Sequence, residues 1–450
     1  MNVSFRFRTP LAAAVGFGLL VAGTAFAQQP ARVHKPKADV HAAADLSSPK
    51  LESLARGTRV QVTGQQGLWY RLQRGDGSDG FVRINDLRMQ QPAAEASASQ
   101  RSALFGGGAG RGRVAETATV RGINAGQLRA GGSDTAALRR IEGFRVDASS
   151  ADAHARQQGW QPRAVPWSGE AQPTAIDPRE ATRAERRERV ATARGVLSAI
   201  GGGLLGGRAG STVARVADRS AGKSEAELME EELALGPALS ARILAVAPPW
   251  DNPAAQRRLN LVGRWLASRT SRPDLPWTFA VIDDGEANAF AAPGGYVLVT
   301  RGLYELLADD SELAAVLAHE LSHVVQRDHY EVIRKQQVTE LGKDLAMAQV
   351  RTPGALGFAR SYVERHGAAV LLSSLDRDAE YRSDHAAGIY LARTGFDPLA
   401  FYSVLQKLTA LGSRPAQLAQ LYATHPPLEE RLDRLDRQIG ADAGGRGRRR

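Results

Sequence analysis

The feature that most constrains the fold is a strongly periodic stretch at residues 311–327. Its apolar residues recur at helical spacing and fall on one side of a helix. Those residues are Leu313, Leu317, Leu321 and Val324. His319 and His323, four residues apart, share a different side. The leucines are expected to anchor the helix in a core while the histidines face a cleft, and Ser311 is the expected N-cap.

Residues 319–323 read His-Glu-Leu-Ser-His. Two imidazoles one helical turn apart can converge on a single ion. Glu320 projects from the next turn toward the same space, where a carboxylate can act as a base toward water without binding the metal. A catalytic metal needs a third protein ligand. Because the chain has no cysteine, that ligand must come from histidine or a carboxylate.

The best downstream candidate for the third ligand is Glu380. Asp384 follows one helical turn later, so both carboxylates face the same way. One can bind a metal while the other accepts a hydrogen bond from a metal-binding histidine and fixes its tautomer. The alternative is an exposed acidic helix face, paired with Arg377 and Arg382.

The surrounding region, residues 223–440, reads as a mainly helical α+β domain. Periodicity predicts helices and β-prone composition predicts short strands. The expected helices are 225–246 and 257–268, and the expected strands are 277–282, 288–291 and 296–300. Pro237, after Gly236, is expected to kink or divide the first helix. The predicted fold is therefore multidomain, with a small all-β barrel ahead of this domain and its short sheet.

Three blocks of sequence together resemble a known family. They are Asn-Ala-Phe-Ala-Ala-Pro-Gly-Gly at 288–295, the His-Glu-Leu-Ser-His block, and Glu-Tyr-Arg-Ser-Asp at 380–384, followed by Ala387-Gly388. Their order and spacing resemble the gluzincin metallopeptidases of the HtpX-like group, which includes the CAAX prenyl endopeptidase and the periplasmic BepA-type proteases. The resemblance covers about residues 224–437.

This resemblance implies a zinc endopeptidase with one Zn²⁺ per chain, bound by His319, His323 and Glu380. It implies that Glu320 is the general base and that Asp384 accepts a hydrogen bond from a zinc-binding histidine. It also implies an edge strand on which a polypeptide substrate aligns by strand addition. The residues of that strand are Asn288, Ala289, Phe290 and Ala291.

A fourth block, at residues 425–431, reads His-Pro-Pro-Leu-Glu-Glu-Arg. In BepA-type relatives a similar segment packs over the metal, which implies that His425 and Arg431 lie at the site. In a resting state, His425 could take the fourth zinc position. Alternatively, His425 or Arg431 could stabilise the oxyanion that develops during the reaction. The alternative is that the prolines merely end a helix.

Residues 28–92 predict a separate small β domain. Short β-prone runs alternate with glycine-rich turns. The order of Gly57, Trp69, Gly80-Phe81-Val82 and Leu87 resembles the bacterial SH3-like domain of cell-envelope proteins. In that family the domain often binds a wall component. A spacer or an intramolecular docking module is the equal alternative.

The remaining segments are read from composition. Residues 1–27 combine two arginines, a short apolar run and Ala-Phe-Ala, the pattern of a cleaved secretory signal. Residues 93–222 are an Ala/Gly/Arg-rich linker with a small helical unit, and 441–450 form a basic tail. The mature chain, expected in the periplasm, shows no apolar run long enough to span a bilayer.

The net charge of +10 comes from scattered arginines without interleaved aromatic residues, which argues against nucleic-acid binding. The expected function is zinc-dependent hydrolysis of unfolded or misassembled envelope proteins. Two alternatives stay open at this point: an envelope adaptor or chaperone acting through the SH3-like domain, and a zinc peptidoglycan hydrolase.

Overall fold

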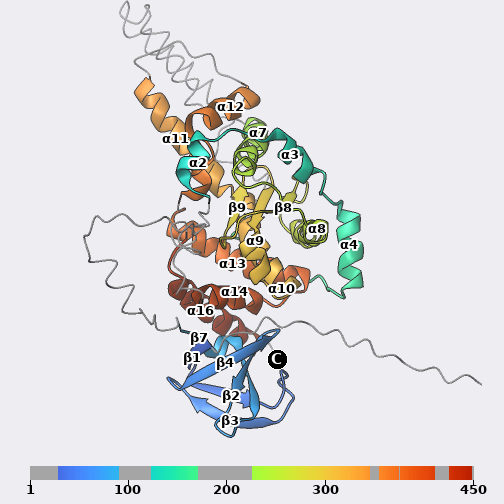
Figure 1. Cartoon of the computed structure of the whole chain (residues 1–450), viewed down its shortest axis with the longest axis vertical. Helices are drawn as coiled ribbons and strands as arrows, with labels where there is room; N and C mark the ends of the chain where they lie inside the picture. Colours follow the sequence, from blue (N-terminus) through green and yellow to red (C-terminus); the bar gives the residue numbers. More distant parts are fainter. Residues whose placement is uncertain are drawn as a thin grey trace, which may run out of the picture.

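The computed structural model describes residues 29–90, 123–170, 225–344, 354–373, 375–410 and 425–447. The predicted signal segment, most of the linker and the glycine-rich stretch at 195–210 lie outside these ranges. Within them the chain forms an all-β unit followed by a mostly helical unit with a small sheet, as the sequence predicts (Figure 1). No helix in the described ranges is both long and apolar enough to cross a bilayer.

The N-terminal unit is one sheet of seven antiparallel strands in the order β3-β2-β6-β5-β4-β1-β7. Their bounds are β1 Gln29–Val33, β2 Lys37–His41, β3 Lys50–Ala55, β4 Arg59–Gln66, β5 Trp69–Gln73, β6 Asp79–Arg83 and β7 Leu87–Met89, with the 3-10 helix η1 Ile84–Asp86 before β7. Alternate residues point inward, so that Val40, Val62 and Val82 are buried.

The second unit surrounds a three-stranded sheet of order β8-β10-β9, in which β9 is an edge strand antiparallel to β10. The strands are β8 Thr278–Ile282, β9 Ala289–Ala292 and β10 Tyr296–Thr300. The helices are α7 Glu225–Leu244, α8 Pro253–Ala267, α9 Arg301–Leu306, α10 Asp310–Val325, α11 Asp328–Asp344, α12 Ala355–His366, η2 Ala369–Leu372, α13 Arg377–Thr394, α14 Leu399–Ala410 and α16 Leu428–Gly447. The last helix thus continues into the predicted basic tail.

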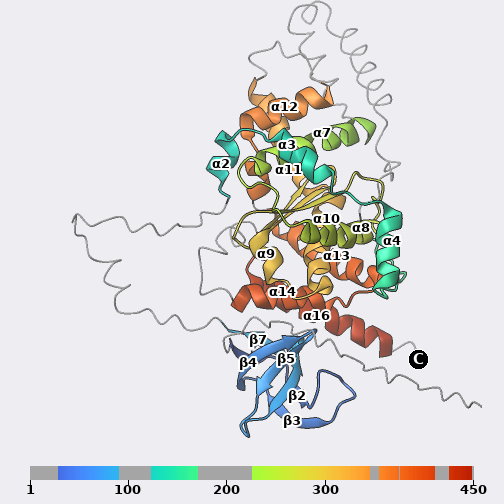
Figure 2. The ribbon, with the colours of Figure 1, turned by 45° about the vertical axis from the view of Figure 1, so that its right-hand side comes forward.

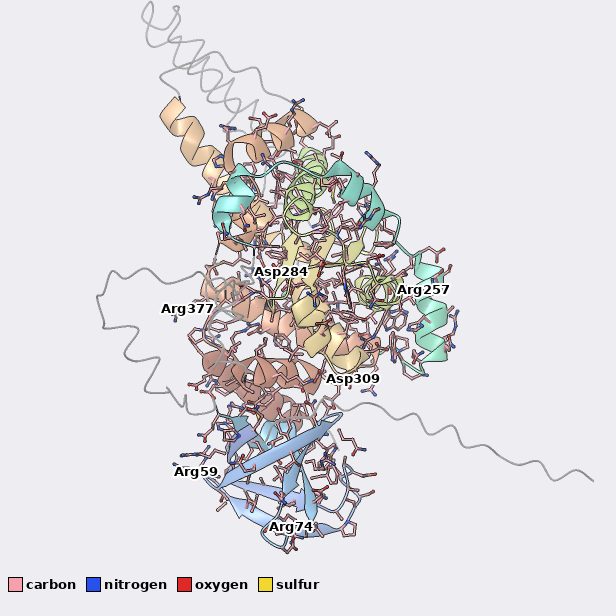
Figure 3. The ribbon with its side chains drawn as sticks, in the orientation of Figure 1. Arg59, Arg74, Arg257, Asp284, Asp309 and Arg377 are labelled. Atoms are coloured by element: carbon pink, nitrogen blue, oxygen red, sulfur yellow. The ribbon has the colours of Figure 1, made fainter. Side chains whose placement is uncertain are left out.

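Helix α10 lies at the centre of this unit, between the sheet and helices α8, α13 and α14 (Figure 2). All its residues from Glu312 to Val325 are buried, the histidines as well as the leucines. The predicted cap was wrong: Asp309, not Ser311, caps the helix by accepting hydrogen bonds from the backbone N–H groups of Ser311 and Glu312 (Figure 3). Asp309 precedes Ser311 and already satisfies these donors, so Ser311 lies inside the first turn.

Three short helices, α2 Ala125–Ala130, α3 Thr135–Glu142 and α4 Ala148–Gln157, run along the outside of the helical unit. They fall in the stretch for which a small helical unit is predicted. Asp284, labelled in Figure 3, accepts a hydrogen bond from the backbone N–H of Ile123 and so ties the start of this segment to the sheet region. Ile141 and Leu128 are fully buried and join the core of α7 and α12.

The β unit is docked on α14 and α16 (Figures 1 and 2). At the edge strand β7, Gln406 of α14 accepts from the backbone N–H of Met89 and donates to the carbonyl of Leu87. One side chain therefore caps an edge that would otherwise expose unpaired backbone groups. Arg88 reaches Asp436 of α16 at 2.6 Å, and Lys35 reaches the same carboxylate at 2.9 Å.

Helix α7 continues through Pro237, so of the two predicted outcomes the division is wrong, while a kink stays a prediction. Leu235 and Leu239, on either side, are both fully buried. The packing of this face holds the helix together although proline removes one backbone hydrogen bond. The neighbouring Gly236 is needed for a close approach: a Cβ there would lie 2.1 Å from the carbonyl oxygen of Pro293.

We expect Gly236→Ala to lower the free energy of unfolding by about 1–3 kcal/mol, because the added methyl group meets rigid backbone and overpacks the contact. The measurement is chemical denaturation followed by tryptophan fluorescence. Gly388→Ala is the matched control within helix α13, where the nearest atom to an added Cβ is 3.8 Å away. It should be neutral or stabilise by up to about 1 kcal/mol. Equal effects of the two substitutions would contradict the close-approach argument.

Candidate metal centre

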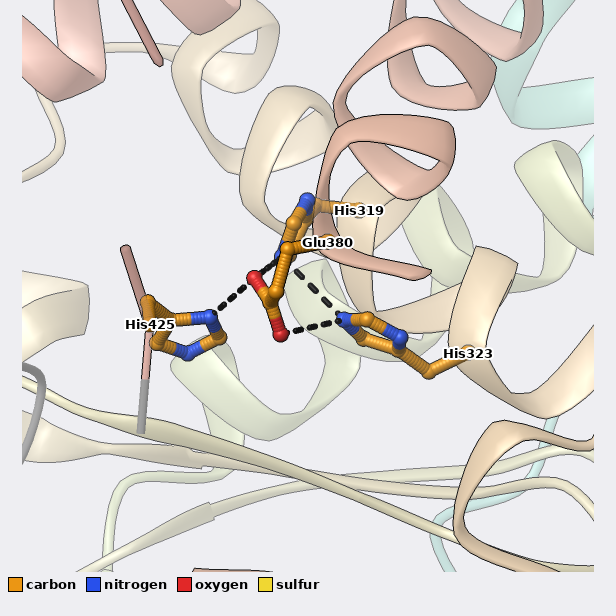
Figure 4. Close-up of side chains that lie close together, drawn as sticks. All are labelled: His319, His323, Glu380 and His425. Atoms are coloured by element: carbon orange, nitrogen blue, oxygen red, sulfur yellow. Dashed lines mark hydrogen bonds and ion pairs between the residues drawn. The ribbon is translucent and has the colours of Figure 1, made fainter. Parts of the chain in front are cut away.

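Four side chains from three parts of the chain meet beside β9: His319, His323, Glu380 and His425. One nitrogen or oxygen atom of each lies within 4.8 Å of the others (Figure 4). The Nε2 atoms of His319 and His323 are 3.2 Å apart. The Glu380 carboxylate lies 3.6 Å from His319 Nε2 and 3.7 Å from His323 Nε2. The structure therefore brings together the three ligands that the sequence predicts.

Local structure explains how Glu380 reaches this point. Asp376 caps α13 by accepting from the backbone N–H of Ala379, so the helix starts just before Glu380. Helix α13 packs along α10, and the first turn of α13 faces the histidines. Glu380 and Asp384, one turn apart, then both point at α10.

The donor set fits a divalent transition metal. His319 Nδ1 lies 3.1 Å from Asp384, and His323 Nδ1 lies 2.9 Å from Asp328. A carboxylate at Nδ1 favours the tautomer with the proton on Nδ1, which leaves the lone pair on Nε2. Two such lone pairs then face each other across 3.2 Å, beside an anionic carboxylate. Two imidazoles with one carboxylate are ligands that transition metals accept, so these groups could hold a metal ion between them.

With no metal ion bound, the charges of the cluster favour a proton on His319 and an ionised Glu380. Burial alone would lower the pKa of His319, but contacts with Asp384 and Glu380 outweigh it and raise the pKa to about 9. Burial alone would raise the pKa of Glu380, yet His425 and His319 hold it far below its usual range. The carboxylate thus stays ionised although only 1% of it is exposed.

Asp384 is the predicted partner behind the ligands, and the structure places it there. Its contact with His319 is an ion-pair distance, although the imidazole N–H is not aligned on it as a hydrogen bond. Arg431 donates to both oxygens of Asp384, at 3.0 and 2.6 Å, and is 2% exposed. Burial alone would raise the pKa of Asp384, but the charge of Arg431 outweighs it and lowers the pKa to about 2.

Sequence reasoning missed Asp328, which begins α11. Its carboxylate accepts from His323 Nδ1 at 2.9 Å and from Arg382 at 2.5 Å. The turn that places it contains Arg327, with a φ of 61°, the left-handed region that residues other than glycine rarely adopt. Because this turn follows the end of the periodic pattern, helical spacing gave no signal for Asp328.

A pocket opens beside the four side chains. Glu320, the predicted base, lines it together with Glu380, His323 and His425. His329 of α11 also lines it and is 8% exposed; burial, then the nearby His323, lowers its pKa to about 4. Apolar side chains, among them Leu371, also line the pocket.

The edge strand β9 forms another wall of this pocket, through Ala289, Phe290 and Ala291. The side chain of Phe290 is buried in the core shared with α7 and α12, which holds the strand in place. Asn288, predicted with them, lies just before the strand, where its backbone N–H donates to Thr300 Oγ1 at 2.9 Å. Asn288 therefore ties the start of the strand to β10.

The structure also brings the fourth predicted block to the site. His425 Nδ1 lies 2.6 Å from Glu380 Oε2. The two prolines that follow precede α16; residues 411–424 lie outside the described ranges, so the alternative that the prolines end a preceding helix stays open. Arg431, in the first turns of α16, faces Asp384 as described above. An oxyanion-stabilising role for either residue stays a prediction.

Comparison with known proteins gives two family matches. Residues 253–439 match peptidase family M48, and residues 36–86 match the bacterial SH3 domain. The chain is 30% identical over 211 residues to the beta-barrel assembly-enhancing protease of Yersinia pestis, covering 45% of this chain and 43% of the relative. It is 32% identical over 224 residues to a protease HtpX homolog of Desulfatibacillum aliphaticivorans, covering 41% and 69%.

A more distant relative is the mitochondrial metalloendopeptidase OMA1 of Schizosaccharomyces pombe, 29% identical over 163 residues, which cover 36% of this chain and 47% of the relative. The chain therefore spans less than half the length of the Yersinia and Schizosaccharomyces proteins. The match to peptidase family M48 covers most of the helical unit, where the four side chains meet.

We expect Asp328→Asn to weaken metal binding by about 10–100-fold, because the neutral amide no longer supports the charge on His323. Metal affinity is measured by competition with a chromophoric chelator. Asp283→Asn is the matched control, since this carboxylate pairs with Arg301 at the surface. Unchanged affinity in Asp328→Asn would show that this carboxylate does not support the ligand.

Proposed function

Because the chain belongs to peptidase family M48, we propose that it is a zinc-dependent endopeptidase that cleaves unfolded or misassembled proteins of the bacterial cell envelope. The observation that carries the proposal is the pair of imidazole nitrogens 3.2 Å apart beside the ionised Glu380.

In this proposal His319, His323 and Glu380 hold one Zn²⁺. When bound, zinc supplies Lewis-acid polarisation of the scissile carbonyl and makes a water more acidic. Asp384 and Asp328 keep each imidazole in the tautomer that presents Nε2 to the ion. Arg431 neutralises Asp384 and so acts as a positioning residue.

Glu320 acts as the general base. Its carboxylate faces the same pocket as the ligands without belonging to the ligand group. It takes a proton from the attacking water and later delivers that proton to the leaving amine. The proton thus passes from water to the new N-terminus through one side chain.

The substrate is a polypeptide in extended conformation. The edge strand β9 has one side free of strand partners in the described sheet, and three of its residues line the pocket. A peptide added beside Ala289–Ala292 would satisfy these backbone groups and pass its own backbone in front of Glu320. Binding through backbone groups suits unfolded proteins, because it does not depend on a particular side chain.

The envelope assignment rests on two further features. Residues 1–27 have the pattern of a cleaved secretory signal, which supports export of the mature chain to the periplasm. The name of the Yersinia relative, a beta-barrel assembly-enhancing protease, points to the same compartment. We propose that the SH3-like unit, while docked on α14 and α16, presents its remaining surface to a wall or envelope component.

The first test is chemical. Glu320→Gln should retain zinc at one ion per chain but lower the rate of casein cleavage by at least about 10²-fold, because the amide cannot accept a proton. Zinc is counted by elemental analysis and cleavage is followed with a labelled substrate. Proteolysis at the wild-type rate in this variant would refute the assignment of the base.

The second test removes the metal. Dialysis against a chelator should abolish cleavage, and one equivalent of zinc should restore it. Purified sacculi serve as the alternative substrate: soluble muropeptides released from them, without cleavage of unfolded protein, would favour a peptidoglycan hydrolase. Chelator-insensitive binding of envelope protein without any cleavage would favour the adaptor function.

A further inference from the structure

One buried polar side chain at the pocket is without a partner. His329 lines the pocket with Glu320 and His323, and more than nine-tenths of it is shielded from solvent. Within the ranges that the structure describes, no hydrogen bond reaches its ring, and Nδ1 is buried with no partner. An unpaired buried imidazole is unfavourable for stability. Such a group is therefore a candidate for binding something that enters the pocket.

The position of His329 is fixed from two sides. Arg327 turns the chain between α10 and α11, so that Asp328 and His329 are presented in succession to the metal cluster. Asp328 is held by His323 and Arg382. The ring of His329 lies edge-on to that of His323, with centroids 6.0 Å apart. A donor that already lies at the pocket needs little reorganisation when charge develops nearby.

Peptide hydrolysis is accelerated by such a donor. When water attacks the scissile carbonyl, negative charge develops on the carbonyl oxygen and must be stabilised. The other basic groups near the pocket are engaged: Arg431 donates to both oxygens of Asp384, and His425 pairs with Glu380. His329 has a ring N–H to offer from the same pocket as Glu320.

We propose that His329 is a catalytic residue, whose imidazole N–H donates a hydrogen bond to the oxyanion that forms on the scissile carbonyl of a polypeptide bound along β9. The inference rests on the proposed function and assigns a residue to it. In the step, the water oxygen bonds to the carbonyl carbon and the carbonyl π electrons move to oxygen. The proton stays on His329, and the electrons return when the C–N bond breaks.

The test compares His329→Leu with His329→Gln, each as the full chain loaded with zinc. Removing one oxyanion donor typically lowers kcat by about 10²–10³-fold. His329→Leu should show this loss with KM little changed, whereas His329→Gln, which keeps an N–H donor, should recover part of it. His154→Leu, in the distant helix α4, is the matched control and should behave as wild type.

The second readout is binding of a phosphinic peptide, which mimics the tetrahedral oxyanion, measured by calorimetry. Its affinity for His329→Leu should fall by the same factor as kcat/KM, with zinc content and melting temperature unchanged. Wild-type kcat and phosphinate affinity in His329→Leu would overturn the assignment. So would a loss that tracks zinc content or melting temperature, because His329 would then serve only packing.

The two proposals fail in different ways. If wild-type enzyme cleaves casein in a chelator-sensitive manner but His329→Leu matches it, only the role of His329 is lost. If zinc-loaded wild-type enzyme neither cleaves nor binds the phosphinic peptide, the proposed function itself is refuted, and the role of His329 with it.

Discussion

Buried charge is the constraint on which the arrangement around α10 depends. A carboxylate removed from water is unfavourable by several kcal/mol unless basic groups or donors replace its hydration. Three carboxylates in or against α10 are 1–2% exposed, and each meets a basic side chain from another part of the chain. The pairs are Glu312 with Lys407, Glu380 with His425, and Asp384 with Arg431. These pairs restrict which helices can lie against α10 and in which register.

Helices and strands could be predicted from the sequence wherever the local residue pattern favoured a single structure. The sheet strands and α10 were predictable because apolar residues repeat at the spacing of each element. The N-cap of α10 was not, since Asp309, Asp310 and Ser311 are all good caps and only the packed helix selects among them. The continuity of α7 through Pro237 was not predictable for a similar reason. Proline disfavours a continuous helix, but apolar packing on both sides of Pro237 opposes this effect, and the sequence alone does not show that packing.

Some residues of the candidate metal site could also be predicted from local patterns, and others could not. His319 and His323 follow from helix geometry, which fixes residues four apart on one face. Glu380 lies 57 residues after His323, and His425 lies further on. Predicting that these two residues join the site required a family resemblance, since no local rule relates segments so far apart. Asp328 and His329 escaped both arguments. They follow a left-handed turn at Arg327, and no periodic pattern extends across such a turn.

The docking of the β unit on the last helix has a consequence for how the protein is made. Arg88 and Asp433 are 345 residues apart in sequence, yet their side chains form an ion pair. Contacts of such separation form late, because the intervening chain must first be synthesised and ordered. The same last helix brings Arg431 to Asp384. A nascent chain would thus lack the buried cation that pairs with Asp384 until its final helix had been synthesised, so the surroundings of the candidate metal centre are completed last.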